Sequence, residues 1–291
     1  MLSPLNSRSR TPYFAEYVSK TLEKLGCPLS HPPHSPLLHP TVERVTNPQQ
    51  LQKALLNHAT ETQVDIEAAL WYLSDHGLDA LAWYKPVHTA GIERWGIYFH
   101  APRIVQFSEW VRIQLGEPDL EPVLKQIAIA VLHHERFHFL TEACATHMEE
   151  HTGRSIYTPY QKQIYEPSFP HEECIEEGLA NLYMLTRQYD TRGFHHTSNT
   201  AFKYVLRQAC DISPPAYRGY KRWLEGRPKG PTSPRERLRE GCGCLAQVLM
   251  TQTTPKGRIA DWSPVPWARF DLWCELPSRI KNNLPTYILK K

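Results

Sequence analysis

Two histidines four residues apart, inside an apolar helical stretch, constrain this chain more than any other feature. The segment Val131–Phe139 reads Val-Leu-His-His-Glu-Arg-Phe-His-Phe and continues the apolar run Ile127–Leu132. An α-helix turns by about 100° per residue, so His134 and His138 project from one face, about 40° apart. Their imidazoles can therefore converge on one cation. We expect a long helix over 123–150 that carries a metal site.

Glu135 stands between the two ligand candidates and completes the pattern HExxH. This pattern is typical of zinc metallohydrolases, in which the glutamate acts on a water beside the metal. One alternative is a pair of hydrogen-bonded core histidines. A second is a carboxylate-bridged di-iron bundle, because Glu135 and His138 also form Glu-x-x-His. That site needs a second Glu-x-x-His on a facing helix, and we find none in the sequence.

A later segment resembles the gluzincin clan of metallopeptidases, whose glutamate ligand lies on a second helix in an Asn-Glu-Gly-Phe-Ala-like setting. Glu176-Glu177-Gly178-Leu179-Ala180 is similar to that setting, and we expect its helix over 172–189. The resemblance covers roughly residues 92–190. It implies that one Zn²⁺ per chain is bound by the two HExxH histidines and Glu177, with Glu135 as the general base.

Seven further side chains are candidates for a role at the site. Asn181 stands where the clan often has an aspartate that orients a zinc-bound histidine, and an amide oxygen can accept the same hydrogen bond. Glu173 is the competing metal ligand, although Gly178 and Ala180 favour Glu177 because small residues permit close helix packing. Glu142 lies one turn beyond His138, either near the site or exposed. Tyr183 is a candidate hydrogen-bond donor to the transition state, as are Tyr165, His195 and His196.

The alternation of patterns along the chain predicts an α+β fold. We expect a small twisted sheet, packed on the HExxH helix and on the glutamate-bearing helix. Trp95–His100 and Arg103–Ser108 are predicted strands, and the resemblance implies that the second is an edge strand that binds substrate by strand addition. We expect four regions: a Pro/His-rich N-terminal segment (1–45), a helical preface (46–80), a metallopeptidase core (81–200) and a basic, Pro-rich C-terminal region (201–291). The C-terminal region is predicted to contain a short helix (244–251) and two strands (267–273 and 286–289).

Charge and cysteine usage bear on partners and location. The net charge of +3 is too small to indicate a nucleic-acid or membrane partner. Residues 203–240 carry ten Lys or Arg and four Asp or Glu, which predicts a solvated, Pro-broken loop or, as the weaker alternative, a surface for nucleic acid or an acidic protein. Seven scattered cysteines, no secretory signal and no membrane-length apolar run predict a soluble, cytoplasmic protein.

The function implied by the resemblance is zinc-dependent hydrolysis of peptide bonds in a peptide or protein substrate. We expect a selective or regulated enzyme, because a digestive protease would be harmful in the cytoplasm. The alternative is a catalytically silent protein of metallopeptidase fold that binds a protein or nucleic-acid partner through its basic C-terminal region. The intact Glu135 disfavours this alternative. Nothing in the sequence specifies the oligomeric state.

Overall fold

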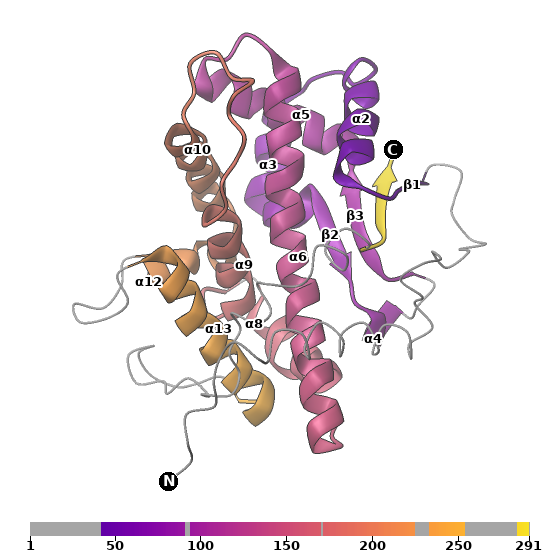
Figure 1. The fold of residues 1–291 in the computed structure, drawn as a ribbon, viewed down its shortest axis with the longest axis vertical. Helices are drawn as coiled ribbons and strands as arrows, with labels where there is room; N and C mark the ends of the chain where they lie inside the picture. The colour runs from indigo at the N-terminus through magenta and orange to yellow at the C-terminus, as the bar shows by residue number, and fades with distance from the viewer. Residues whose placement is uncertain (1–41, 91–93, 170, 225–232, 254–283, 291) are drawn as a thin grey trace.

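The computed structural model describes residues 42–90, 94–169, 171–224, 233–253 and 284–290. These residues form a mostly helical structure with one small four-stranded mixed sheet, which confirms the α+β class. Helix α6 (Leu120–Thr152) runs through the centre of the molecule. The sheet lies on one side of it, and α9 (Ile175–Leu185), α12 (Tyr220–Leu224) and α13 (Pro234–Thr251) lie on the other side (Figure 1).

The predicted helical preface is present as α2 (Pro48–Ala59) and α3 (Ile66–His76). Asn47 caps α2 by accepting a hydrogen bond from the backbone N–H of Gln50, and Asp65 caps α3 in the same way. Gly77 ends α3 with a φ of 64°, and a Cβ at this position would lie only 2.1 Å from the ring of Tyr217. The short helix η2 (Gly77–Ala80) starts at this glycine.

The sheet joins distant parts of the chain. Its strands have the order β1 (Val42–Val45), β4 (Thr286–Leu289), β3 (Gly96–His100) and β2 (Ala82–Lys85). β3 and β4 pair in parallel, and the two outer pairs are antiparallel. The strands predicted near 95–100 and 286–289 are confirmed. β2 is an edge strand, and both β2 and β3 contact α6.

The strand predicted at Arg103–Ser108 is wrong, because this segment belongs to helix α5 (Ala101–Leu115). Pro102 stands in the first turn of α5, where its missing N–H costs no hydrogen bond. Ile104, Phe107 and Val111 are buried at helical spacing, and Gly116 ends the helix with a φ of 66°. A six-residue segment that contains β-branched side chains does not distinguish a strand from a helix. The helical spacing of the buried residues over the whole of Ala101–Leu115 identifies the helix.

The two helices of the predicted site are both present. α6 covers the predicted 123–150 and ends at Gly153, whose φ is 66°. α9 is shorter than the predicted 172–189, because residues 171–174 form a turn before it. α6 and α9 pack along each other, and Gly178 of α9 lies against Gly219, where a Cβ would come within 2.8 Å of backbone. The small residue thus permits the close approach that the sequence predicted.

The prediction of a Pro-broken loop over 203–240 is wrong in its described part. The segment forms α10 (Asn199–Ile212), α11 (Pro215–Arg218), α12 and the start of α13. Their inward side chains, such as Tyr217 and Trp223, are buried, and Pro215 and Pro234 stand in the first turns of α11 and α13, where a proline is tolerated. α13 includes the predicted 244–251 but starts ten residues earlier at a capping box formed by Ser233 and Glu236. The predicted strand 267–273 lies outside the described residues.

Several short helices follow β2 and α6. α4 (Val87–Ala90) follows β2 directly. α7 (Tyr157–Tyr160), the π-helix η3 (Gln161–Tyr165) and α8 (Glu166–Ser168) follow α6 and precede α9. They place Tyr157, Tyr160 and Tyr165 around the same cavity as Glu135 and His138.

Candidate metal centre

Helix α6 supplies two imidazoles and a carboxylate to one buried position. His134 and Glu135 are completely buried, and His138 is 7 % exposed. The Nε2 atoms of the two histidines lie 3.3 Å apart, as the four-residue spacing predicted. Both histidines therefore present the same ring nitrogen to one point.

Glu177 reaches this point from α9. Its Oε2 lies 3.3 Å from Nε2 of His134, and its Oε1 lies 3.6 Å from Nε2 of His138. Glu173, the competing ligand candidate, is exposed in the turn before α9. The structure thus brings Glu177, and not Glu173, next to the histidine pair.

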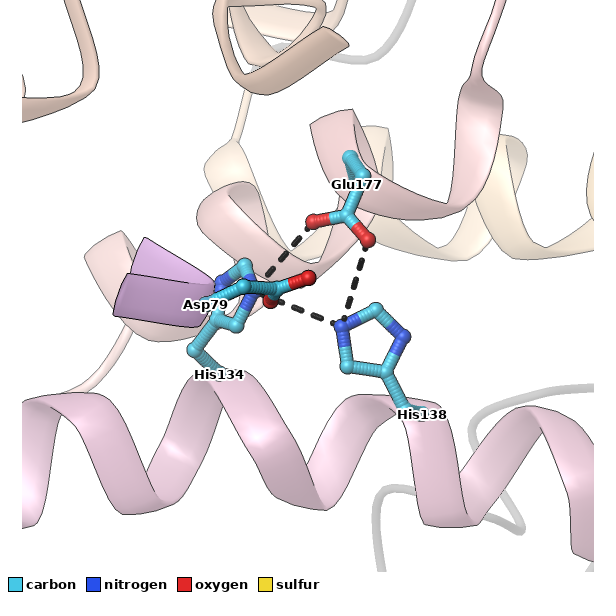
Figure 2. Close-up of side chains that lie close together, drawn as sticks. All are labelled: Asp79, His134, His138 and Glu177. Atoms are coloured by element: carbon cyan, nitrogen blue, oxygen red, sulfur yellow. Dashed lines mark hydrogen bonds and ion pairs between the residues drawn. The ribbon is translucent and has the colours of Figure 1, made fainter. Parts of the chain in front are cut away.

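The cluster has a fourth member, Asp79, which was not predicted from the sequence. It lies on η2, between α3 and β2. One carboxylate oxygen of Asp79 and one donor atom from each of His134, His138 and Glu177 all lie within 4.8 Å of one another. Figure 2 shows the four side chains pointing toward a common centre. No local pattern marks Asp79, because only tertiary packing, in which η2 contacts α3, β2 and α10, brings it there.

Hydrogen bonds orient both imidazoles through their other nitrogen. Nδ1 of His134 lies 2.9 Å from Oδ1 of Asn181, and the Asn181 amide donates to the backbone carbonyl of Tyr217 at 2.7 Å. Nδ1 of His138 lies 2.7 Å from Glu176, which also accepts a hydrogen bond from Tyr160 at 2.7 Å. Acceptors at both Nδ1 atoms leave both Nε2 atoms available to a cation.

Buried negative charge dominates the electrostatics of the cluster. Burial and the charge of Glu177 raise the pKa of Asp79 to about 8. Burial and the charge of Asp79 raise the pKa of Glu135 well above its usual range. Carboxylates this close and this deeply buried do not all ionise unless positive charge is added, and a divalent cation supplies such charge.

His138 supplies positive charge within the cluster, and the pKa values of His138 and Glu177 depend on each other. Burial alone would lower the pKa of His138, but the carboxylates of Glu177 and Glu176 raise it well above its usual range. Burial alone would raise the pKa of Glu177, but the charge of His138 lowers it to about 2. Burial lowers the pKa of His134. A cation at His138 would therefore replace a proton, so its binding weakens as the pH falls.

The donor distances fit a tetrahedral cation. Ligands about 2.0–2.1 Å from zinc in a tetrahedron lie roughly 3.3–3.4 Å from one another. The two Nε2 atoms lie 3.3 Å apart, and the Glu177 carboxylate approaches them with its two oxygens, Oε2 at 3.3 Å from His134 and Oε1 at 3.6 Å from His138. Tyr165 donates to Oε1 of Glu177 at 2.5 Å, whereas both oxygens of Glu135 are buried near the backbone of Tyr84 and accept no hydrogen bond from a side chain of the described residues. A buried carboxylate without a partner is costly, and a nearby cation or water would offset this cost.

A cavity of about 190 Å³ lies beside the cluster. Its polar lining includes Asp79, Glu135, His138 and Glu176, and its remaining walls are largely aromatic side chains from β2, α7 and η3. The edge strand β2 forms one side of this cavity. The cavity therefore connects the HExxH residues with a strand that has one open edge in the described part of the sheet.

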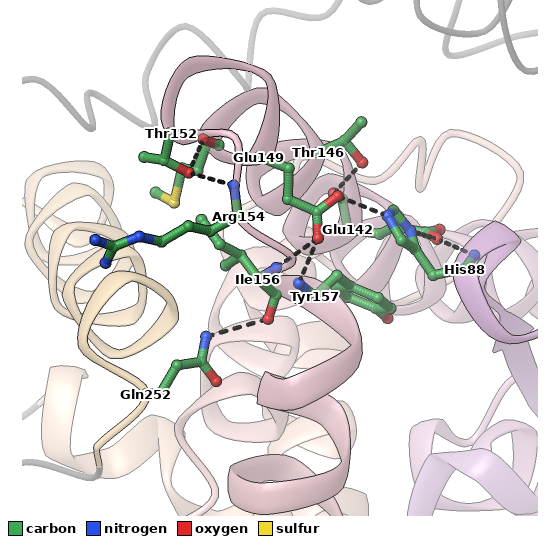
Figure 3. A network of polar contacts seen from close by, with 10 residues as sticks. His88, Glu142, Thr146, Glu149, Thr152, Arg154, Ile156, Tyr157 and Gln252 are labelled. Carbon is green, nitrogen blue, oxygen red and sulfur yellow. Dashed lines mark hydrogen bonds and ion pairs between the residues drawn. The ribbon is translucent and has the colours of Figure 1, made fainter.

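Two of the predicted site residues lie elsewhere. Glu142 is neither exposed nor in contact with the histidine pair: it accepts hydrogen bonds from the backbone and ring of His88 (Figure 3). It also accepts a hydrogen bond from the Tyr84 hydroxyl. Tyr183 is buried against the rings of His133 and Phe137 and beneath the guanidinium of Arg187, and it does not line the cavity.

Of the other predicted hydrogen-bond donors, Tyr165 lies at the cluster, whereas His195 and His196 do not. Tyr165 contacts Glu177, as described above. The backbone N–H groups of His195 and His196 donate to the buried carboxylate of Glu117, and the ring of His195 contacts Asp119. These two histidines thus hold the chain near the start of α6 and are not part of the cluster.

Comparisons with known protein families, with curated proteins and with solved structures found no match for this chain. None of the helices in the described residues is sufficiently long and apolar to span a membrane.

Proposed function

We propose that His134, His138 and Glu177 bind one Zn²⁺ and that the chain is a zinc-dependent metallopeptidase. One observation carries this proposal. The two Nε2 atoms lie 3.3 Å apart and within 3.6 Å of the Glu177 carboxylate, and the buried carboxylate of Glu135, which accepts no hydrogen bond from a side chain of the described residues, stands beside them. Core histidines without a metal would not need an additional buried carboxylate that accepts no hydrogen bond from a side chain.

The reaction adds water across the C–N bond of a peptide and yields a carboxylic acid and an amine. Bound zinc would lower the pKa of a water and polarise the scissile carbonyl. Glu135 takes a proton from the attacking water and later gives it to the leaving amine nitrogen. Burial and Asp79 raise the pKa of Glu135, which suits a group that must both accept and release a proton.

The surrounding side chains hold the ligands in position. Asn181 and Glu176 accept hydrogen bonds from the two imidazoles, and Tyr165 donates to Glu177. All three ligands therefore have a second contact that restricts their rotation. Such contacts typically change metal affinity by about 10- to 100-fold.

The edge strand β2 is the element that we expect to bind the substrate backbone. It replaces the segment Arg103–Ser108, which is helical. β2 pairs with β3 on one side, and Trp83 and Tyr84 of β2 line the cavity next to Glu135. An extended peptide can add to such an edge through backbone hydrogen bonds.

The proposal includes selective or regulated hydrolysis in the cytoplasm. The described cysteines at 144, 174, 210, 242 and 244 are free and buried, which suits a reducing compartment. The alternative remains a catalytically silent protein that binds a partner through its basic C-terminal region. Ion pairs from Lys221 to Asp211 and from Arg222 to Glu172 already use part of that basic charge.

The first test is elemental analysis of the purified chain and of His138→Ala, combined with cleavage of a mixed peptide library. Circular dichroism would verify that both proteins are folded. One zinc per chain that is lost in His138→Ala, together with peptide cleavage, is the expected result. Zinc without cleavage would favour the silent alternative. Two irons per chain would favour the di-iron alternative, and the absence of metal would refute the site.

A further inference from the structure

The cavity beside the cluster is small. A cavity of roughly 150 Å³ accommodates benzene, whereas sites for drug-sized ligands span about 300–1,000 Å³. The volume here, about 190 Å³, therefore suits one amino-acid residue, and the rest of an extended peptide would lie along β2 outside the cavity. The aromatic walls include Tyr157, Tyr160 and Tyr165.

The lining of the cavity is acidic, and its carboxyl groups ionise when a cation occupies the neighbouring site. Asp79, Glu135 and Glu176 all contribute to it, and no Lys or Arg is among the described residues that form it. A free carboxylate group would be repelled here, whereas an ammonium group would be attracted. The two buried Glu135 oxygens, which accept no hydrogen bond from a side chain of the described residues, point to a ligand in this cavity.

Asp79 is the carboxylate that remains for such a ligand. Glu176 already accepts hydrogen bonds from His138 and Tyr160, and Glu135 is assigned to proton transfer. Catalytic zinc sites have three protein ligands and keep a further position for water and substrate. His134, His138 and Glu177 supply these three, so the nearby Asp79 is left to contact the substrate.

The position of Asp79 suits an α-amino group. Within one residue the amino nitrogen lies only about 2.5 Å from the carbonyl carbon, as bond lengths and angles dictate. A carboxylate that binds this nitrogen must therefore stand next to the ligands that hold the carbonyl. Asp79 does so, because its oxygen lies within 4.8 Å of the other three donor atoms. Leu78 and Ala80 are buried on either side, which fixes η2 in place.

We propose that the cavity holds the N-terminal residue of the substrate and that Asp79 binds its α-ammonium group, so that the chain acts as an aminopeptidase. This inference rests on the proposed function and specifies its substrate class. The small volume of the cavity limits the substrate to one residue before the scissile bond. The negative lining selects a free amino terminus over a blocked one.

The test compares free and acetylated amines in the zinc-loaded full chain. Calorimetry measures the binding of leucinamide and of N-acetyl-leucinamide, and a parallel assay measures hydrolysis of leucyl-aminocoumarin and its N-acetyl form. We expect free amines to bind about 10- to 100-fold more tightly, as a charge-assisted hydrogen bond predicts. Asp79→Asn should remove this preference and retain the zinc. Glu173→Gln, which changes an exposed carboxylate outside the cavity, is the matched control.

Each outcome has a distinct meaning. Equal binding of leucinamide and its acetylated form to the unmodified chain would overturn the inference, even if Asp79→Asn failed to fold. Loss of zinc in a folded Asp79→Asn would also overturn it, because Asp79 would then be a metal ligand. A clear preference for the free amine without hydrolysis of either coumarin substrate would count against the proposed hydrolysis and would leave the amine site supported.

Discussion

Oδ1 of Asn181 lies 2.9 Å from Nδ1 of His134, and this contact defines how the imidazole faces the cluster. The amide nitrogen of Asn181 donates to the backbone carbonyl of Tyr217, so the amide oxygen must face the histidine. Only a protonated Nδ1 can donate to that oxygen, which leaves Nε2 with a free electron pair. The α9 helix thus controls the tautomer of a residue on α6.

Replacement of Asn181 by leucine should therefore weaken zinc binding. Leucine has nearly the same shape but accepts no hydrogen bond, so the neutral imidazole is free to protonate either nitrogen. We expect the dissociation constant for zinc to rise by about 10- to 100-fold. Competition with a chromogenic chelator measures this change. Asn57→Leu on the exposed face of α2 is the control, and equal affinities of the two variants would contradict the role of Asn181.

A second prediction separates the two candidate glutamate ligands. Glu177→Gln should lose zinc at stoichiometric concentration, because an amide is a much weaker ligand than a carboxylate. Glu173→Gln should retain one zinc per chain, because Glu173 is exposed in the turn before α9. Elemental analysis after gel filtration measures both. Retention of zinc by a folded Glu177→Gln would remove this residue from the ligand set.

Glu135→Gln tests the general base separately from the metal. The substitution keeps the shape of the side chain but removes the group that accepts the proton. We expect unchanged zinc content and a loss of peptide hydrolysis of at least about 100-fold, the usual contribution of a general base. Loss of zinc in this variant would instead make Glu135 a ligand, and full activity would assign proton transfer to another group.

The central part of this site was predictable because its geometry is local. The four-residue spacing fixes the angle between His134 and His138 on any helix, whatever the rest of the chain does. Gly178 gave the second signal, since a small residue beside Glu177 permits α9 to approach its neighbours closely. Both signals depend on short stretches of sequence.

Asp79 was not predictable for the opposite reason. It stands 55 residues before His134, in a four-residue helix without a motif, and only tertiary packing brings it to the cluster. The edge strand was misassigned because Arg103–Ser108 is short, and its β-branched residues fit either structure. β2 itself has only four residues, too few to show a clear alternation, and its neighbour β3 pairs on its other side with β4, which comes from the far end of the chain.

The close contact between α9 and the C-terminal helices gives a stability prediction. In Gly178→Ala the new Cβ would lie 2.8 Å from the backbone of Gly219, which no side-chain rotation relieves. We expect a loss of about 1–3 kcal/mol in the free energy of unfolding, typical of overpacking. Gly193→Ala is the control, because its Cβ would meet only the Pro122 side chain at 3.3 Å. Equal denaturation midpoints would argue against a tight contact.

The final prediction concerns His88, which joins α4 to the far half of α6. Its Nδ1 lies 2.6 Å from Glu142, and its Nε2 lies 3.0 Å from Glu149 (Figure 3). Burial alone would lower the pKa of His88, but the hydrogen bonds to Glu142 and Glu149 raise it to about 9. A histidine pKa that is higher in the folded state means that the protonated form stabilises the fold.

The sign of the pH dependence follows from this shift. The stabilisation is complete below the unfolded pKa of about 6.5 and is lost as the pH rises through about 9. His88→Gln should therefore lower the free energy of unfolding by about 1–2 kcal/mol at pH 6, a value reduced for partial solvent screening, and by much less at pH 9.5. Urea denaturation at both pH values measures the difference. His76→Gln, at an exposed histidine on α3, is the control and should have little effect at either pH. An equal loss of stability for His88→Gln at both pH values would show that the charge of His88 does not stabilise the protein.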